Sequence, residues 1–281
     1  MNLPSPEQEL HHPLFEEKGL SVWIKRDDLI HPFVSGNKWR KLEPIIEVAK
    51  QAGVHTLVSF GGAYSNHLLA LAASAASFGF KSRGIVRGDR VSNPLLRLCS
   101  QFGMELEFMT REAFREARAT ETHLKFIDGE LWIPEGANCL EGRAGMASLW
   151  KELKQSYTHV LDSVGSGTSA RGLHANKPDA SELLAIMAVK DARLAEQLRE
   201  EGIQVFTDYA RGGFAKMDAG LFDACRAFTS HSGILLDPVY TGKQWMALLD
   251  LVQNDFFSPE QRLLFIHSGG LAGWMSNPER A

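Results

Sequence analysis

The stretch Ser35-Gly36-Asn37-Lys38-Trp39-Arg40-Lys41-Leu42-Glu43 joins a short Ser-Gly-Asn turn to an apolar run of helical character. It places Lys38 near the start of that helix, where the positive end of the helix dipole disfavours an ammonium ion. Burial would lower the pKa of the same lysine further. A lysine with a lowered pKa can attack a carbonyl carbon and form a Schiff base. The alternative is an ordinary solvated lysine on a helix face, and motifs further along the chain bear on that choice.

Length and composition fit one large or two modest α/β domains, because 281 residues of which 44% are hydrophobic can form substantial cores. A net charge of -4 argues against a nucleic-acid partner and against a membrane surface. The three cysteines are far apart and form no C-x-x-C pair, which argues against a zinc site and predicts a cytoplasmic location. The N-terminus does not resemble a signal peptide, and no apolar run is long enough to span a bilayer.

Short apolar runs alternate with segments of helical period, a rhythm typical of parallel sheets flanked by helices. The predicted strands cover residues 22–25, 56–59, 83–86, 105–109, 159–164, 183–189, 205–207, 234–236 and 263–267. The predicted helices cover 44–52, with Pro44 in the first turn, then 66–78, 94–102, 112–122, 192–201, 220–231 and 243–252. The helix over 66–78 is apolar nearly all round, which predicts burial.

Three predicted strands end in glycine-rich loops, at Gly61-Gly62, at Gly165-Ser166-Gly167-Thr168 and at Ser268-Gly269-Gly270. Open α/β sheets bind ligands at these carboxyl ends. The first loop, Gly61-Gly62, leads into Ser65-Asn66-His67 at a helix start. Free N–H groups there can bind a carboxylate or a phosphate, and Ser65 and Asn66 add side-chain donors. The alternative is an ordinary helix N-cap, for which serine and asparagine are common choices.

The second loop, Gly165-Ser166-Gly167-Thr168, follows the strand over 159–164. Glycines allow close backbone approach, and consecutive N–H groups with hydroxyls form an anion-binding nest. The loop matches neither the P-loop nor G-x-G-x-x-G, so a phosphate ester held by backbone and hydroxyls is the favoured ligand, with a flexible turn as the alternative. No pair of histidines has metal-ligand spacing, so no metal site is predicted, and no nucleophile elbow is present.

The third segment, Asp237-Pro238-Val239-Tyr240-Thr241-Gly242-Lys243, lies between a predicted strand and a predicted helix. A tyrosine and a threonine in such a loop can face a ligand. The alternative is a capping loop in which Thr241 is the N-cap.

In chain order, these motifs resemble the pyridoxal-phosphate (PLP) enzymes of the tryptophan-synthase β fold, specifically the group of 1-aminocyclopropane-1-carboxylate (ACC) deaminases and D-cysteine desulfhydrases. The resemblance runs from Ile24 to Gly270, and it is carried by Lys25-Arg26-Asp27-Asp28-Leu29, Gly36-Asn37-Lys38 through Glu43, Ser65-Asn66-His67, and Asp237 through Lys243. It implies an α/β fold of type II: two domains of open, mostly parallel twisted sheets with helices on both faces. Residues 1–43 and 141–281 would form a large PLP-binding domain, 44–140 a small inserted α/β domain, and the enzyme a homodimer.

The resemblance also implies roles for individual residues. Lys38 would hold the cofactor aldehyde and move protons, and Tyr240 would be an acid–base or orienting group. Ser65, with Asn66 and His67, would bind the substrate carboxylate, and Ser65 would also take part in catalysis. The remaining cofactor contacts would be Asn66 at the ring hydroxyl, Thr241 at the pyridine nitrogen, and Gly165, Ser166, Gly167 and Thr168 at the phosphate.

His67 and Thr241 are similar to D-cysteine desulfhydrases, whereas ACC deaminases look like Ser-Asn-Gln and Val-Tyr-Glu at these places. A glutamate keeps the pyridine nitrogen protonated and makes the ring a stronger electron sink. Opening a cyclopropane needs that sink more than loss of a thiolate does. The residues His67 and Thr241 therefore favour α,β-elimination from a D-amino acid. The expected reaction converts D-cysteine to pyruvate, sulfide and ammonia. The alternatives are ACC deamination and a catalytically impaired homologue that binds PLP or amino acids.

Three departures from the family pattern bear on the substrate. Phe214 stands where the family tends to have a substrate-facing tyrosine, so it is expected at the substrate without a hydroxyl. The segment from Arg171 to Asp208 is shorter than in relatives. Leu271-Ala272-Gly273-Trp274 replaces the usual Ala/Val-Pro-Ala.

Overall fold

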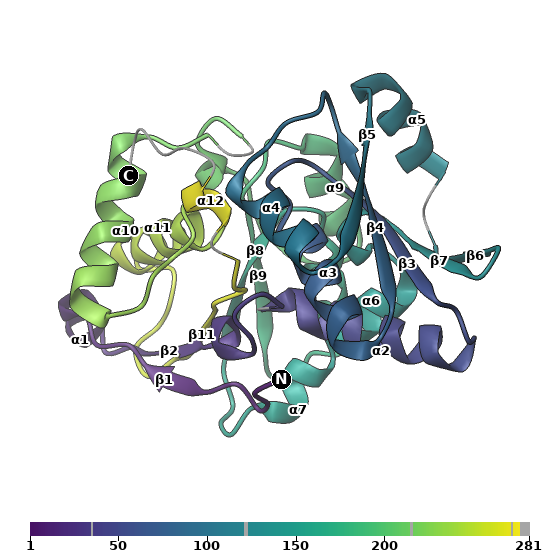
Figure 1. The fold of residues 1–281 in the computed structure, drawn as a ribbon. Helices are drawn as coiled ribbons and strands as arrows, with labels where there is room; N and C mark the ends of the chain where they lie inside the picture. Colours follow the sequence, from purple (N-terminus) through teal and green to yellow (C-terminus); the bar gives the residue numbers. More distant parts are fainter. Residues whose placement is uncertain (35, 121–122, 214–215, 271, 276–281) are drawn as a thin grey trace.

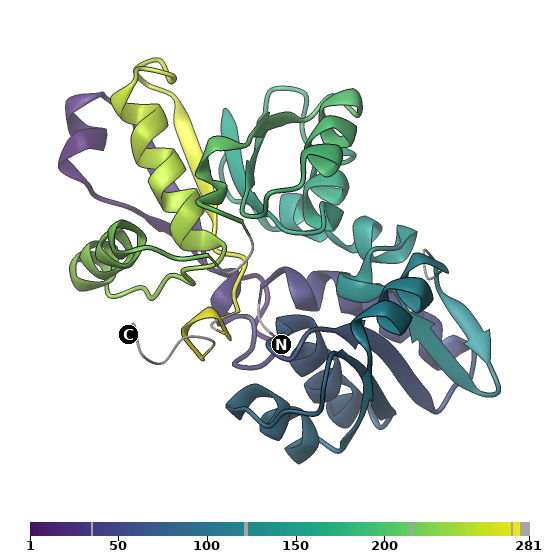
Figure 2. The same cartoon turned by 90° about the horizontal axis from the view of Figure 1, so that it is seen from above.

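The chain folds around two separate sheets, which occupy different halves of the molecule (Figures 1 and 2). The structure is a computed structural model, and it describes residues 1–34, 36–120, 123–213, 216–270 and 272–275. Both sheets are mostly parallel with helices on both faces, so the predicted fold class is confirmed. The exact domain boundaries stay a prediction, and one helix, α2 (Asn37–Gln51), runs across the boundary predicted after residue 43.

The larger sheet has six strands in the order β1-β2-β11-β8-β9-β10. Every neighbouring pair is parallel except β1 with β2. One face packs against α1, α10 and α11, and the other against α8 and α9. The bounds are β1 Glu7–Glu9, β2 Ser21–Lys25, β8 His159–Val164, β9 Glu182–Met187, β10 Gln204–Phe206, β11 Arg262–Ile266, α1 Pro13–Glu17, α8 Thr168–His174, α9 Ala192–Glu200, α10 Ala219–Ser232 and α11 Thr241–Gln253.

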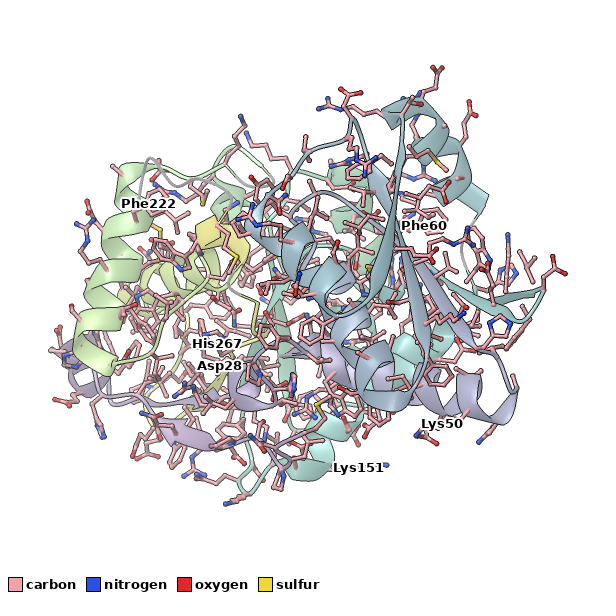
Figure 3. All side chains as sticks on the ribbon, in the orientation of Figure 1. Asp28, Lys50, Phe60, Lys151, Phe222 and His267 are labelled. Carbon is pink, nitrogen blue, oxygen red and sulfur yellow. The ribbon has the colours of Figure 1, made fainter. Side chains whose placement is uncertain are left out.

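The smaller sheet has five strands in the order β5-β4-β3-β7-β6, and only β6 with β7 is antiparallel. Helices α2, α3 and α4 share a core with one face, while Phe114 of α5 packs on the other face beside Phe60. The bounds are β3 Thr56–Gly61, β4 Lys81–Arg87, β5 Met104–Met109, β6 Lys125–Ile127, β7 Glu130–Ile133, α3 Asn66–Phe78, α4 Pro94–Gln101 and α5 Arg111–Thr120, followed by α6 Leu140–Gly145, α7 Ser148–Glu152 and, near the C-terminus, α12 Ala272–Met275. Figure 3 shows Phe60 and Phe222 in these two separate cores.

Helix α3 spans residues 66–78 as the sequence predicts. The Ser65 hydroxyl caps it by accepting from the N–H of Leu68 at 3.2 Å. Gly79 ends it with a φ of 79°, a left-handed conformation that glycine adopts without strain. Residues 67–75 are all buried, so the predicted burial is also confirmed.

The prediction of a helix over 44–52 is wrong at its start, because α2 begins at Asn37 and contains Pro44 in its interior. Proline has no N–H, so the carbonyl of Arg40 lacks its usual partner four residues on. Gly145 of α6 packs against that carbonyl so closely that an added Cβ would lie 2.0 Å from the Arg40 oxygen. The helix therefore accommodates its proline where α6 crosses it.

The prediction of a strand over 234–236 is also wrong. The carbonyls of Leu235 and Leu236 accept from the side chains of His267 at 2.9 Å and Trp274 at 2.8 Å instead of from a neighbouring strand. The sequence analysis also missed the hairpin of β6 and β7. Its turn is Asp128-Gly129, with φ of 48° and 79°, and Asp-Gly between short apolar runs is the local signal that would have revealed it.

Candidate active site

A cleft of about 780 Å³ opens where the carboxyl ends of strands from both sheets meet. The loops after β3, β8 and β11 all contribute to its lining, represented by Gly62, Gly165 and Gly269. Parallel sheets bind ligands at this edge because the loops there converge and their backbone groups are not used by the sheet. The three glycine-rich loops identified in the sequence therefore come together in space.

The start of α2 reaches this cleft through a close backbone contact. Gly36 has a φ of 65°, and a Cβ at this position would lie 1.6 Å from the carbonyl oxygen of Ser268. Only glycine fits there. The N–H of Asn37 donates to the same carbonyl at 3.2 Å, which joins α2 to the loop after β11.

Lys38 is the second residue of α2 and lines the cleft. Burial lowers the pKa of its amine to about 8, against the opposing attraction of Asp237 and Asp162. The ammonium donates to the side-chain oxygen of Asn37. Asn37 in turn donates to the hydroxyl of Ser169 at 3.0 Å. Lys38 is therefore held in place, and it is neutral often enough near pH 8 to act as a nucleophile.

Lys41 and Asp162 also line the cleft, and the sequence analysis did not select them. Lys41 lies one helical turn after Lys38, and this i, i+3 spacing is the signal that places both on one face. Burial and the repulsion of Lys38 lower the pKa of Lys41. Burial raises the pKa of Asp162, and among the described residues neither of its carboxyl oxygens has a hydrogen-bond partner. Lys41 and Asp162 are therefore two buried charged groups in the cleft, and within the described part of the chain the carboxyl group of Asp162 is left unsatisfied.

Ser65, Asn66 and His67 all face the cleft at the start of α3. The hydroxyl of Ser59 lies 2.8 Å from the carbonyl of Ile133 and 2.9 Å from Nε2 of His67. A carbonyl only accepts, so Ser59 donates to it and accepts from Nε2–H of His67. Nδ1 of His67 is therefore an unprotonated acceptor, and no described group pairs with it. Burial, with Lys38 and Lys41, lowers the pKa of this ring to about 3, so the ring is neutral at physiological pH.

The loop at Gly165, Ser166, Gly167 and Thr168 forms a polar wall of the cleft. Gly167 has a φ of 79°, and the hydroxyls of Ser166 and Thr168 lie 2.9 Å apart. A Cβ on Gly165 would lie 3.0 Å from the ring of Tyr240, so glycine is needed to keep these two walls together. Backbone N–H groups beside two hydroxyls suit a phosphate ester.

Tyr240 lines the cleft, and its loop is fixed by Asp237. The carboxylate of Asp237 accepts from the N–H groups of Val239, Tyr240 and Gly273 at 2.8 to 3.1 Å. Burial nevertheless raises the pKa of Asp237 to about 6. Asp237 also lines the cleft, and the sequence analysis had not assigned it a role.

Thr241 is fully buried and does not line the cleft. Its hydroxyl accepts from the N–H of Asp237 at 2.8 Å and lies 3.3 Å from the carbonyl of the same residue. The predicted contact of Thr241 with a pyridine nitrogen thus stays a prediction, and in this structure its hydroxyl caps the turn before α11. Phe214, expected at the substrate, lies outside the described residues.

These groups fit PLP by their chemistry. The cleft holds an amine of lowered pKa, Lys38, and a glycine–hydroxyl loop suited to a phosphate. Its volume lies within the range of about 300 to 1,000 Å³ common for sites that enclose small molecules. Within the described residues, no helix has the length and apolarity needed to cross a membrane.

Comparisons with known proteins agree with this chemistry. Residues 7–269 match the family model described as pyridoxal-phosphate dependent enzyme. A Thermotoga maritima protein named "Putative 1-aminocyclopropane-1-carboxylate deaminase" is 30% identical over 99% of this chain and 97% of its own length. A D-cysteine desulfhydrase from Salmonella newport is 29% identical over 95% of this chain and 92% of its own.

Solved structures show the same fold. A crystal structure described as an ACC deaminase homologue superposes with a TM-score of 0.84 at 24% identity, covering 99% of this chain and 93% of the other. An L-serine ammonia-lyase from Rhizomucor miehei gives 0.71 at 16% identity, covering 95% and 94%. With a family match over nearly the whole chain, this protein belongs to the pyridoxal-phosphate-dependent enzymes, in the group that is similar to ACC deaminases and D-cysteine desulfhydrases.

Proposed function

We propose that this enzyme is a lyase that removes the β-substituent of a D-amino acid, with D-cysteine as the substrate. In the overall reaction, D-cysteine and one water give pyruvate, hydrogen sulfide and ammonium. Bound PLP supplies an electron-withdrawing ring that stabilises negative charge at the α-carbon. The residues of this chain then bind the amino acid, move its α-proton and keep the reacting atoms in place.

Lys38 is the proposed base for the α-proton. A base works best when its pKa lies near the working pH, and burial brings the pKa of Lys38 to about 8. The side chains of Ser65 and Asn66, which line the cleft at the start of α3, are proposed to donate hydrogen bonds to the substrate carboxylate. The Ser65 hydroxyl is held in place because it also accepts from the N–H of Leu68. Tyr240, which lines the cleft beside Gly165, is proposed to orient the β-substituent.

The observation that carries the choice of reaction is the residue after Tyr240. It is Thr241, a hydroxyl, where an acidic residue would keep the pyridine nitrogen protonated. A sulfur leaving group needs less electron withdrawal than a carbon–carbon bond of a cyclopropane. In this proposal the Thr241 hydroxyl, which accepts from the N–H of Asp237 at 2.8 Å, would donate to the pyridine nitrogen of PLP in place of the carbonyl of Asp237. His67, as a neutral acceptor, is proposed to receive a proton donor of the bound substrate.

ACC deamination is the second candidate, and one observation favours it. Asp237 is a carboxyl group that lines the cleft with a pKa of about 6. If it rather than Thr241 faces the pyridine nitrogen, the ring would carry the proton that ring opening requires. The name of the Thermotoga relative points to the same reaction for that protein.

That the enzyme is a homodimer and lies in the cytoplasm stays a prediction.

The test is pyruvate release by the purified protein with added PLP, offered D-cysteine, L-cysteine, D-serine and ACC in parallel. Pyruvate with equimolar sulfide from D-cysteine alone supports the proposal. Deamination of ACC, which keeps all four of its carbons, gives 2-oxobutanoate in place of pyruvate. Release of 2-oxobutanoate from ACC would favour the second candidate. Turnover of L-cysteine in place of D-cysteine would contradict the assigned hand of the substrate.

A further inference from the structure

Four arginines surround a second cavity of about 420 Å³ at the margin of the cleft. They are Arg87, Arg111, Arg115 and Arg118, with Phe114 as the fifth lining residue. Arg87 and Arg118 line the main cleft as well, so the two spaces adjoin. Neither the family chemistry nor the proposed reaction uses this cavity.

The arginines come from two elements that the small sheet fixes relative to each other. Arg87 is the last residue of β4. Arg111, Arg115 and Arg118 recur at helical spacing along α5, so they share one face of that helix. Phe114 on the same helix is 1% exposed and packs edge-on against Phe60 with ring centroids 5.8 Å apart. The buried phenylalanine anchors α5, and the guanidinium of Arg87 lies 6.0 Å from its ring.

The cavity lies beside the proposed site of the substrate carboxylate. A Cβ built on Gly62 would be 3.7 Å from the guanidinium of Arg87. Gly62 belongs to the loop that precedes Ser65, and both residues line the cleft. On the other side, Arg118 pairs with Glu135 at 2.8 Å, and Gly136 after it faces the hydroxyl of Ser166. Arg87 and Arg118 therefore join the arginine cavity to the cleft, Arg87 near the loop before Ser65 and Arg118 near the loop at Ser166.

The charges of this cluster are not balanced by the protein. Within the described ranges, the guanidinium of Arg118 has one carboxylate partner, whereas the side chains of Arg87, Arg111 and Arg115 have neither an ion pair nor a hydrogen bond. The chain as a whole has more acidic than basic residues, 34 against 30. Like charges gathered around one cavity repel each other, and an anion between them removes that cost. A guanidinium offers the planar donors that bind carboxylate, sulfonate or phosphate with two hydrogen bonds.

We infer that this arginine cavity is a second anion subsite, which takes an acidic group that the amino-acid substrate carries beyond its β-carbon. The inference rests on the proposed function, and it adds to the substrates of that site D-amino acids that carry a second carboxylate, sulfonate or phosphate. Such compounds bind more tightly than neutral ones of the same shape. D-Cysteine, which lacks this group, would use only the inner part of the cleft.

The experiment compares D-glutamate with D-glutamine by isothermal titration calorimetry on the PLP-loaded enzyme. The two ligands are nearly the same size, differ by one charge and have no β-leaving group, so binding is measured without elimination. We expect D-glutamate to bind about tenfold more tightly, because hydrogen bonds to charged groups contribute more than neutral ones. Arg87→Gln and Arg115→Gln should reduce that preference several-fold, while Arg115→Lys should retain part of it.

Arg97→Gln is the matched control, because Arg97 is an exposed arginine of α4 that lines neither cavity. It should leave the preference unchanged. Inorganic phosphate is titrated in the same way to separate a free anion from one attached to the substrate. If phosphate binds in a way that depends on Arg115 but D-glutamate binds no more tightly than D-glutamine, the cavity is a site for a free anion. That result would overturn its assignment to an acidic group of the substrate.

Pyruvate release from β-chloro-D-alanine, measured on the same preparation, separates the two levels of the proposal. Turnover with equal affinities for D-glutamate and D-glutamine overturns the anion subsite and leaves the lyase intact. No turnover and no binding of either ligand would remove the lyase assignment, and the subsite with it. Turnover together with an arginine-dependent preference for D-glutamate supports both.

Discussion

Helix α2 connects two buried charged regions that differ in how completely their groups are paired. One is the network of Lys25, Asp27, Arg40 and Glu152, hereafter the Arg40 network. The other is the group of Lys38, Lys41 and Asp162 in the cleft. Arg40 lies between the two lysines in sequence, yet the two regions have opposite electrostatic character.

In the Arg40 network the charged groups are satisfied by one another. Arg40 donates to both carboxylate oxygens of Asp27 at 2.7 Å and to Glu152 at 2.9 Å. Lys25 lies 3.2 Å from Glu152 and donates to the carbonyl of Ser5 at 2.6 Å. These contacts raise the pKa of Arg40 and lower that of Glu152, although burial opposes both shifts. The network ties the N-terminal segment to α2 and α7.

In the cleft group the pKa shifts run the other way, because they favour the neutral forms of the two lysines and of the aspartate. Burial is the largest cause for each member, lowering the pKa values of Lys38 and Lys41 and raising that of Asp162. Buried groups without full partners are costly to the fold and accumulate at functional sites. Burial of charge is common to both regions, so it is the incomplete pairing beside the cleft that distinguishes the candidate site from the Arg40 network. Beside the Arg40 network, Nδ1 of His267 lies 3.9 Å from a carboxylate oxygen of Asp28, the residue after Asp27, and Figure 3 labels both side chains.

The largest expected effect comes from Lys38→Ala. Removal of the proposed base and covalent anchor should reduce pyruvate release by at least about a thousandfold. The melting temperature of the apoprotein should change little, because Lys38 forms no ion pair with any residue that the structure describes. Pyruvate assays and calorimetry measure the two effects. Wild-type turnover in this variant would show that Lys38 is not the reactive group.

Arg40→Met tests the fully paired region. It leaves Asp27 and Glu152 buried without their main partner, which costs about 3 to 5 kcal/mol in comparable pairs. We expect the urea midpoint to fall accordingly, or the protein not to accumulate in folded form. Arg226→Met on α10 is the control, because that arginine is exposed and its one carboxylate partner among the described residues is Asp223 on the same helix. Equal stability of the Arg40 and Arg226 variants would refute the contrast drawn above.

The pH dependence of cofactor attachment tests the pKa of Lys38. The neutral amine is the reactive form, and its fraction rises about tenfold per pH unit below the pKa. The rate at which PLP binds covalently to the apoprotein should therefore rise with pH and level off above about 8. Stopped-flow absorbance follows this reaction. A rate that continues to rise to pH 10 would mean that burial does not perturb this lysine.

Lys41→Met should have the smallest effect on stability. Replacing a buried, poorly paired charge by an apolar side chain of similar size is often neutral or stabilising, so we expect a change within about 1 kcal/mol. Asp162 loses an attractive partner, so its carboxyl should titrate at higher pH, as read by NMR of a labelled sample. A loss of stability as large as that of Arg40→Met would show that Lys41 and Asp162 form a structural ion pair.

Much of the fold could be predicted because local signals and tertiary packing agree. Helix α3 has its cap at Ser65, its stop at Gly79 and an apolar sequence between them, so its bounds follow from residues close in sequence. The strand over 159–164 is likewise confirmed. Pro44 and residues 234–236 misled the prediction because their environment comes from distant elements. The carbonyl of Arg40 faces α6, and the carbonyls of 235 and 236 bond to side chains of 267 and 274.

Local sequence signals were sufficient to predict the alternating fold, the position of Lys38 near a helix start, and the three glycine-rich loops that are able to bind a ligand. These depend on periodicity, capping and turn chemistry, which act over a few residues. Packing between distant elements brings Lys41, Asp162 and Asp237 into one cleft, lets Thr241 cap its own turn, and gathers four arginines of β4 and α5 around a cavity that adjoins the cleft. Burial and charge proximity are properties of space, and residues far apart in the chain acquire them only when the two sheets meet.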